Sequence, residues 1–116
     1  MLCESVKIII FAASLSVSFM NYHPQPLDID KFSIPEQLVE KIARDVHEQW
    51  THERQQQGWV WGERRDDERK EHPGLVPYDK LTDEEKEVDR ATVRTVISSL
   101  LESGATIMIN DCKDNN

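Results

Sequence analysis

The sequence lacks an excess of basic residues, and this narrows the classes of partner. Its 116 residues include 22 Asp and Glu against 14 Lys and Arg, which gives a formal net charge of −8. General nucleic-acid binding needs a basic face, and docking on an anionic membrane needs a basic patch. We therefore expect neither nucleic acid nor a membrane as a partner, and the length indicates one small domain.

Cysteine and the short signatures of catalysis are also scarce. The two cysteines, Cys3 and Cys112, lie near opposite ends, and no Cys or His pair has the spacing of a zinc site. The sequence contains no GxSxG, HExxH, Walker or Rossmann pattern. His47-Glu48 begins like a zinc-binding helix, but position 51 is not a histidine. We therefore expect no catalytic residue, no metal and no cofactor, in a protein that is not an enzyme.

Long hydrophobic runs are limited to one segment near the N-terminus. The run from Ile8 to Met20 has the length of a signal peptide and is short for a membrane span. Residues 1–19 are thus either a signal peptide or a mis-annotated or disordered extension, because translation could begin at Met20. We expect a cytoplasmic protein, or a secreted or periplasmic one if the signal peptide is real. The domain itself is expected over residues 20–109, followed by a polar tail, 110–116.

The first of two amphipathic stretches predicts a helix from about Pro35 to Gln57. Ser33, three residues before Glu36, suggests a capping box at its start, and Gly58 is a natural stop. Apolar residues repeat at every fourth position, as expected of one helix face. This row is Leu38, Ile42, Val46 and Trp50, with Val39 and Ala43 beside it.

The second amphipathic stretch predicts a helix between Thr82 and Gly104. Thr82 and Glu85 form a second capping-box pattern, and Gly104 follows the last periodic residues. The apolar rows are Val88, Thr92, Val96 and Leu100, and beside them Val93, Ile97 and Leu101. Beyond the helix, Ala105 to Ile109 is either a short strand or an apolar tail.

The segments outside the helices predict an extended arm and a long crossover. Tyr22 to Ile34 has two prolines and little periodicity, which is typical of an extended N-terminal arm. Gly58 to Lys80 also lacks a period, and some twenty irregular residues need anchoring in a compact domain. We expect the anchors to be Trp59, Trp61, Leu75, Val76 and Tyr78. The predicted fold is mainly α: two amphipathic helices joined by a long ordered crossover loop.

Aromatic and charged side chains recur along the helices and the crossover, and together they form the candidate ligand-binding site. On the first helix they share one face, with spacings of three and four. The set is His47, Trp50 and Arg54 on the first helix, Trp59, His72 and Tyr78 on the crossover, and Lys86, Asp89 and Arg90 on the second helix.

If these groups converge, they would make an aromatic pocket with cationic donors, which suits a planar anionic ligand. Trp50 and Trp59 would stack on the ring, and Arg54 and Arg90 would grip phosphate or carboxylate. His47, His72 and Tyr78 would supply hydrogen bonds, and Asp89 would orient an arginine. The alternative is structural: the same groups pin the long crossover, and no small molecule binds.

The order of these residues resembles the RyR domain, the repeat that occurs in pairs in ryanodine-receptor calcium channels and singly in bacterial and phage proteins. The resemblance covers roughly Tyr22 to Gly104. Its motifs are Tyr22-x-Pro24-x-Pro26-x-Asp28, His47-x-x-Trp50-x-x-x-Arg54-x-x-x-Gly58-Trp59-x-x-Gly62, His72-Pro73-x-Leu75-x-Pro77-Tyr78, and Leu81-x-x-x-Glu85-Lys86 with Asp89-Arg90.

The resemblance implies a fold of paired helices, a crossover loop and short strand-like pieces. It also implies a docking or regulatory module, a homodimer by analogy with the paired repeats, and sensing of a nucleotide-like small molecule. Two features limit the transfer. The sequence carries one repeat without a channel body, so calcium conduction is not implied, and no Ser or Thr between His52 and Leu81 could accept phosphate.

Overall fold

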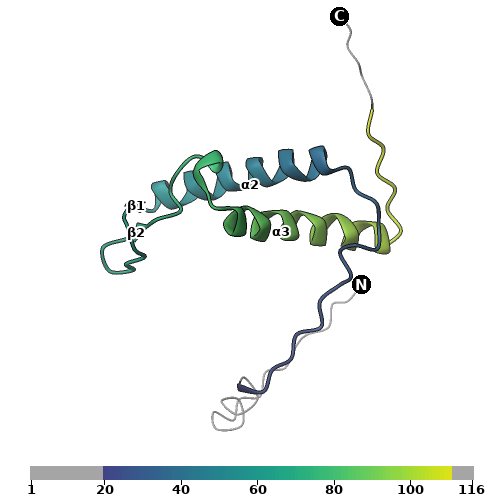
Figure 1. Ribbon diagram of the computed structural model, residues 1–116, viewed down its shortest axis with the longest axis horizontal. Coiled ribbons are helices and arrows are strands. Elements are labelled where there is room, and N and C mark those ends of the chain that lie inside the picture. Colours follow the sequence, from purple (N-terminus) through teal and green to yellow (C-terminus); the bar gives the residue numbers. More distant parts are fainter. Residues whose placement is uncertain (1–19, 111–116) are drawn as a thin grey trace, which may run out of the picture.

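Two helices lying antiparallel and side by side make the body of the protein (Figure 1). The computed structural model describes residues 20–110. Helix α2 spans Glu36–Gln56 and helix α3 spans Asp83–Glu102. The connector between them carries β1 (Val60–Trp61), β2 (Glu71–His72) and the 3-10 turn η1 (Tyr78–Lys80). The mainly α fold predicted from the sequence is confirmed.

The capping boxes and the terminal glycines predicted from the sequence can be compared with the ends of the two helices. The capping box of α3 is present, because Glu85 N–H donates to Thr82 Oγ1 at 3.1 Å and Thr82 N–H donates to Glu85 Oε1 at 2.8 Å. The box predicted for α2 is wrong, since its N-cap is Pro35 and no side chain caps it. Both helices are followed by a glycine in the left-handed region, Gly58 at φ 92° and Gly104 at φ 98°.

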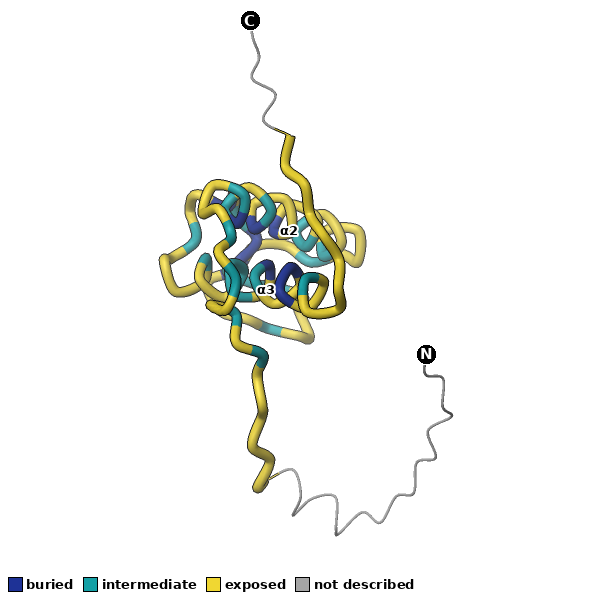
Figure 2. Tube along the Cα trace, turned by 90° about the vertical axis from the view of Figure 1, so that its right-hand side faces the viewer, coloured by how far each residue is buried: buried dark blue, intermediate teal, exposed yellow. Residues whose placement is uncertain are grey.

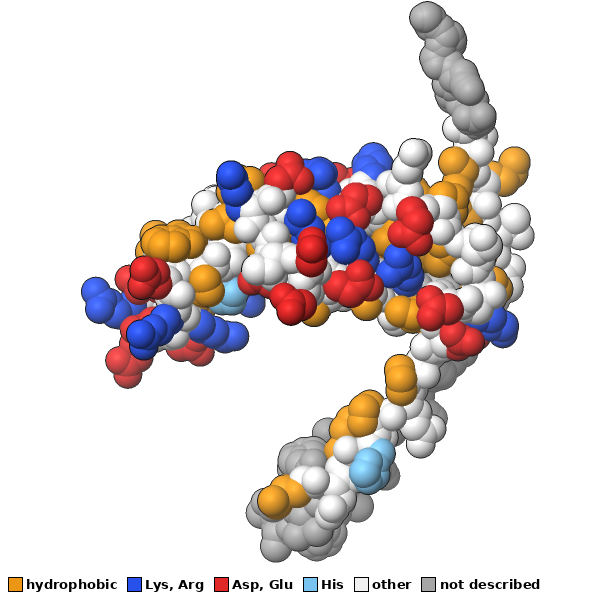
Figure 3. All heavy atoms as spheres, viewed as in Figure 1, with side chains coloured by type: hydrophobic (Ala, Val, Ile, Leu, Met, Phe, Trp, Pro, Cys, Tyr) orange, Lys and Arg blue, Asp and Glu red, His pale blue; other side chains and the backbone are white. Residues whose placement is uncertain are grey.

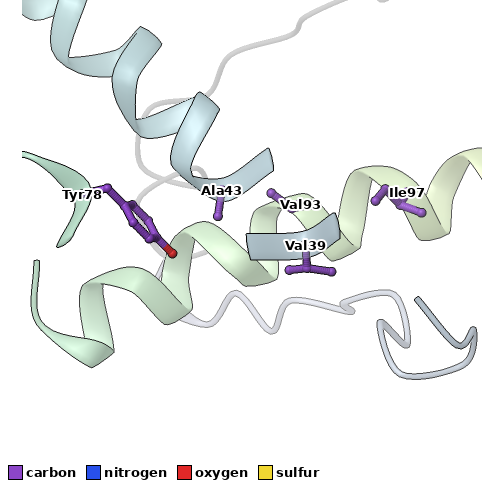
Figure 4. Close-up of a cluster of buried hydrophobic side chains, with 5 residues drawn as sticks. All are labelled: Val39, Ala43, Tyr78, Val93 and Ile97. Carbon is purple, nitrogen blue, oxygen red and sulfur yellow. The ribbon is translucent and has the colours of Figure 1, made fainter. Parts of the chain in front are cut away.

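The core is a thin seam between the facing sides of α2 and α3, where the buried residues gather (Figure 2). Its members come from three elements: Val39 and Ala43 from α2, Tyr78 from η1, and Val93 and Ile97 from α3 (Figure 4). The side chains of Val39 and Ala43 are fully buried. Small residues here let the two helix axes approach closely.

The apolar rows that begin at Leu38 on α2 and at Val88 on α3 lie beside this seam rather than in it. On α2 the buried row is Val39, Ala43 and His47, one position along from the row that begins at Leu38. On α3, Val88 is 66% exposed, Val96 56% and Leu100 48%. A pair of helices has only one seam, so the second row of each remains on an open side. We call the side that carries Val88, Val96 and Leu100 the open face.

The connector is tied to the end of α2 by short backbone pairings. β1 and β2 pair in parallel, Val60 opposite Glu71 and Trp61 opposite His72. Lys70 takes a positive φ of 55° and donates its Nζ to the carbonyl of Gln57 at 2.8 Å. Most of the expected anchors are partly or fully buried, but Trp61 is 54% exposed and does not pack under the helices.

The N-terminal arm runs away from the helices (Figure 1), whereas Ile107, Met108 and Ile109 of the C-terminal tail line a groove with Leu38 and Ile42 of α2. The N-terminal arm is extended, as expected, and Lys31 near its end pairs with Glu102 at 3.2 Å. Residues 105–109 form no strand, so they are the apolar tail of the two alternatives. Within residues 20–110, no helix has the length and apolarity that crossing a membrane requires. The expectations for residues 1–19 fall outside the described residues.

Candidate functional site

A pocket of about 300 Å³ opens between α2, the connector and the first half of α3. Apolar side chains of Val46, Leu81 and Val88 contribute to its lining. The aromatic and polar part of the lining is His47, Trp50, His72, Glu85 and Asp89. Four of the nine residues predicted for a binding site therefore line one cavity, from three separate segments of the chain.

The aromatic wall of the pocket is built by Trp50 and His72. Their rings meet edge to face, with centroids 5.1 Å apart and planes at 72°. His47 stacks on Trp50 from one turn earlier on α2, at 5.7 Å. Behind His72 lies Trp59, 6.3 Å away. This chain of rings joins the end of α2 to the connector and fixes the shape of the wall.

Hydrogen bonds decide which nitrogens of the two histidines carry protons. His47 Nε2 lies 2.7 Å from the carbonyl oxygen of Val76, which can only accept, so this nitrogen donates. His72 Nδ1 accepts the backbone N–H of Gly74 at 2.9 Å, which leaves the hydrogen on Nε2. Burial lowers the pKa of His72, and Arg65 and Arg54 lower it further. His72 is therefore neutral at pH 7, with Nε2–H as a donor.

The two carboxylates of the pocket, Glu85 and Asp89, differ in whether they already have a hydrogen-bond partner. Glu85 is exposed and accepts from Thr82 in the capping box of α3. Asp89, one turn further along, is half-buried, and no hydrogen bond or salt bridge to it occurs within residues 20–110. Burial raises the pKa of Asp89, while nearby His47 acts in the opposite direction. Asp89 is thus the acceptor that the fold leaves available.

Cationic groups stand beside the pocket rather than inside it. The guanidinium of Arg54 lies 5.9 Å from the centroid of Trp50 and 5.8 Å from that of Trp59. It also donates to Gln57 at 2.7 Å. Arg65, from the connector, lies 6.0 Å from the ring of Trp59. Arg54 therefore brings positive charge against Trp50, the indole that walls the pocket, whereas Arg65 is paired with Asp67 at 2.7 Å.

Arg90 does not join this site, and Asp89 does not orient it. Arg90 donates to both oxygens of Glu40, at 2.7 and 3.3 Å, and to Glu87 at 3.3 Å. Successive residues on a helix point about 100° apart, so Asp89 and Arg90 face different sides of α3. Arg90 belongs to a set of ion pairs that links α2 to α3, and Figure 3 shows acidic and basic groups interleaved over the helices.

Tyr78 and Lys86 are also placed away from the pocket. Tyr78 is buried in the core, and burial raises the pKa of its hydroxyl, which makes no hydrogen bond of ordinary length. Lys86 and Arg44 approach its ring at 5.5 and 4.9 Å. Four residues of the pocket were not among those predicted from the sequence: Val46, Leu81, Glu85 and Val88. Spacing held a partial signal, since Glu85 lies one turn before Asp89.

Among residues 20–110, no cluster of three or more His, Cys, Asp or Glu side chains could hold a metal ion.

The family comparison covers the elements that build this pocket. The model of the family described as the RyR domain matches residues 22–109, which include the arm, α2, the connector, α3 and the apolar tail. By this match over most of its length, the protein belongs to the RyR domain family.

Proposed function

We propose that this protein is a non-catalytic binding module that holds the planar ring of a nucleotide-like ligand in the pocket between α2 and α3. Membership of the RyR domain family supports the general role of a binding or regulatory module. The observation that carries the proposal is the aromatic wall of Trp50 and His72, with an unpaired Asp89 in the same pocket.

The size of the pocket favours a single ring system. Its volume of about 300 Å³ lies at the lower end of small-molecule sites. Indole and imidazole faces and edges stack on flat heterocycles, and Val46 and Val88 provide an apolar floor for such a ring. A whole nucleotide exceeds this space, so its sugar and phosphate would lie outside.

The charged side chains around the pocket also favour a ligand with its ring inside the pocket and its phosphate outside. Inside the pocket, Glu85 and Asp89 would repel a phosphate group. Outside it, Arg54 stands against Trp50, and Arg65 lies against the neighbouring Trp59. An anionic ligand would therefore enter ring first and leave its phosphate beside Arg54, where a guanidinium can donate two parallel hydrogen bonds.

The lining also supports binding without turnover. Ser, Thr, Cys and Lys are among the side chains that act as nucleophiles in enzymes. None of these residue types lines the pocket in the described part of the chain. The two histidines that do line it have one nitrogen each committed to the backbone, at Val76 and Gly74.

Calorimetry with a matched set of probes tests the proposal. Nucleoside monophosphates should bind more tightly than the corresponding nucleosides, and inorganic phosphate alone should not bind. Arg54→Gln should reduce the affinity for a nucleotide to that for its nucleoside, while Trp50→Leu should weaken both. Trp61→Leu is the control, because Trp61 is exposed and lies outside the pocket. A nucleotide at a hundred times its Kd should add about 2.7 kcal/mol to the free energy of unfolding.

Failure of every nucleoside and nucleotide to bind would contradict the proposal. Conversion of a bound probe into product would overturn its non-catalytic part. Folding of each variant is checked by circular dichroism, since Trp50 also supports the connector through His72.

A second candidate function, homodimerisation, is favoured by the open face. Its α3 row is exposed and largely uncharged, and Leu38 and Ile42 of α2 lie with Leu100 along one apolar groove of about 630 Å³. A face without charge is compatible with its own copy across a twofold axis, even in a protein of net charge −8. From the sequence, a homodimer is expected on the family resemblance alone.

Sedimentation at increasing protein concentration tests this second candidate. Val96→Asp should prevent dimerisation by placing a charge on the open face. Val60→Asp is a matched control, because Val60 and Val96 are both 56% exposed but Val60 lies on the connector. A monomer at all concentrations in the parent protein would rule the candidate out.

A further inference from the structure

Asp89 is a pocket carboxylate that has no hydrogen-bond partner within residues 20–110. It lines the pocket with neighbours that are largely apolar, and no described group donates a hydrogen bond to it. Other carboxylates between the helices are satisfied: Glu40 binds Arg90, and Glu36 binds Arg94 at 2.9 and 3.2 Å. An unpaired carboxylate that lines a pocket is an acceptor that a bound ligand can use.

The chemistry of a carboxylate restricts what that ligand presents. When ionised, Asp89 offers two acceptor oxygens and no donor, so the partner that matches it best brings two adjacent N–H groups. Glu85 is less available, because one of its oxygens already accepts from Thr82. His72 contributes the complementary group, because its Nε2–H is a donor that no acceptor within residues 20–110 uses. The pocket therefore presents an acceptor pair on α3 and a donor on the connector.

We propose that the pocket selects a guanine-type ring, and that Asp89 is the residue that determines this specificity. Guanine carries a ring N–H directly beside an amino group, which matches the two carboxylate oxygens, and its carbonyl can accept from a donor such as His72. Adenine presents an acceptor nitrogen beside its amino group, and hypoxanthine lacks the amino group altogether. Cytosine and uracil likewise lack two adjacent donors on this edge. This inference rests on the proposed binding of a nucleotide-like ligand.

The guanidinium of an arginine side chain offers the same donor pair, and the structure favours the ring over it. The wall of Trp50 and His72 extends along the pocket, and positive charge at Arg54 lies just outside it. That charge would repel a cationic peptide and would attract the phosphate of a guanine nucleotide.

Calorimetry with GMP, IMP and AMP tests the proposal on the full chain. GMP should bind at least about tenfold more tightly than IMP or AMP, because each lost hydrogen bond to a charged acceptor costs about that factor. Asp89→Asn replaces one acceptor with a donor and should abolish or reverse the preference for GMP over AMP. Glu84→Gln, an exposed carboxylate on the same helix and outside the pocket, should keep it.

The outcomes separate this inference from the proposed function. Equal binding of GMP, IMP and AMP would overturn the guanine preference and leave nucleotide binding intact. An unchanged preference in Asp89→Asn would remove the role of Asp89. Binding of N-acetylarginine amide with no binding of GMP would assign the pocket to a peptide. Absence of binding by all four probes would overturn the guanine preference, and the proposed function would fall with it if the pyrimidine nucleotides also failed to bind. Asp89→Ser provides a second variant that removes the paired acceptor.

Discussion

The imidazole of His72 stands edge-on to the indole of Trp50, 5.1 Å between ring centroids. This contact joins the connector to α2 and makes one continuous wall from two distant segments. The backbone N–H of Gly74 holds the imidazole in place through Nδ1. The shape of the pocket therefore depends on a short turn of the connector.

Gly74→Ala should disturb this wall. A Cβ at position 74 would lie 3.1 Å from Cε1 and Nδ1 of His72 and 3.5 Å from Cη2 of Trp50. The imidazole must move, so we expect a loss of about 1–3 kcal/mol in the free energy of unfolding, measured by urea denaturation. Removing the ring removes the clash, so the same substitution should cost clearly less in a His72→Ala background. Equal costs in both backgrounds would contradict the prediction.

Acidification should weaken the fold through His72. Its folded pKa lies below the ordinary value of 6.5, chiefly because burial disfavours the charged ring. As the pH falls below 6.5, the unfolded chain takes up the proton first, so the free energy of unfolding decreases until the folded pKa is passed. NMR titration of the His72 ring should give a midpoint below 6.5. Arg65→Gln should raise that midpoint, and a parent midpoint at or above 6.5 would refute the assignment.

Replacing Asp89 with asparagine should stabilise the free protein at neutral pH. Burial raises the folded pKa of Asp89 above 3.8, so the folded state loses stability as the pH rises from 3.8 to the folded pKa, and this cost remains at higher pH. Asp89→Asn removes this cost, and the Tm at pH 7 should rise. The gain should disappear below pH 3.8, where both states of the parent are protonated. Glu84→Gln serves as the comparison, and a lower Tm for Asp89→Asn at pH 7 would be the opposite result.

The pair between Arg90 and Glu40 should show a measurable coupling. The two side chains form two hydrogen bonds across the helix seam, at 2.7 and 3.3 Å. A double-mutant cycle with Arg90→Gln and Glu40→Gln should give about 1 kcal/mol. Arg90 lowers the pKa of Glu40, so the coupling is present above pH 4.5 and is lost as the pH falls through the folded pKa. The exposed pair of Arg65 and Asp67 should couple less, and equal coupling would argue against a special role.

Local signals in the sequence located the helices to within one residue. Four-residue apolar spacing and the following Gly58 and Gly104 delimit them, because these features act within a single turn of backbone. The capping box of Thr82 and Glu85 formed as predicted. At the start of α2 the same pattern failed, because Pro35 itself takes the N-cap position.

Periodicity could not tell which apolar row of each helix would be buried. Two adjacent rows differ by one residue, and only the packing of one helix on the other selects between them. The seam took Val39 and Ala43 on one side and Val93 and Ile97 on the other. In the adjacent row of α2, Val46 and Trp50 line the pocket, while Leu38 and Ile42 pack against the edge of the core.

The residue types of the site were visible in the sequence, but their grouping was not. Composition and spacing were enough to predict two amphipathic helices, a long aromatic connector and the His, Trp and Arg side chains of the candidate site. They did not show that Asp89 faces the pocket while Arg90 binds Glu40, because this depends on how the two helices pack. The physical reason is that neighbouring residues on a helix diverge by about 100°, so the partner helix determines which one faces the cavity.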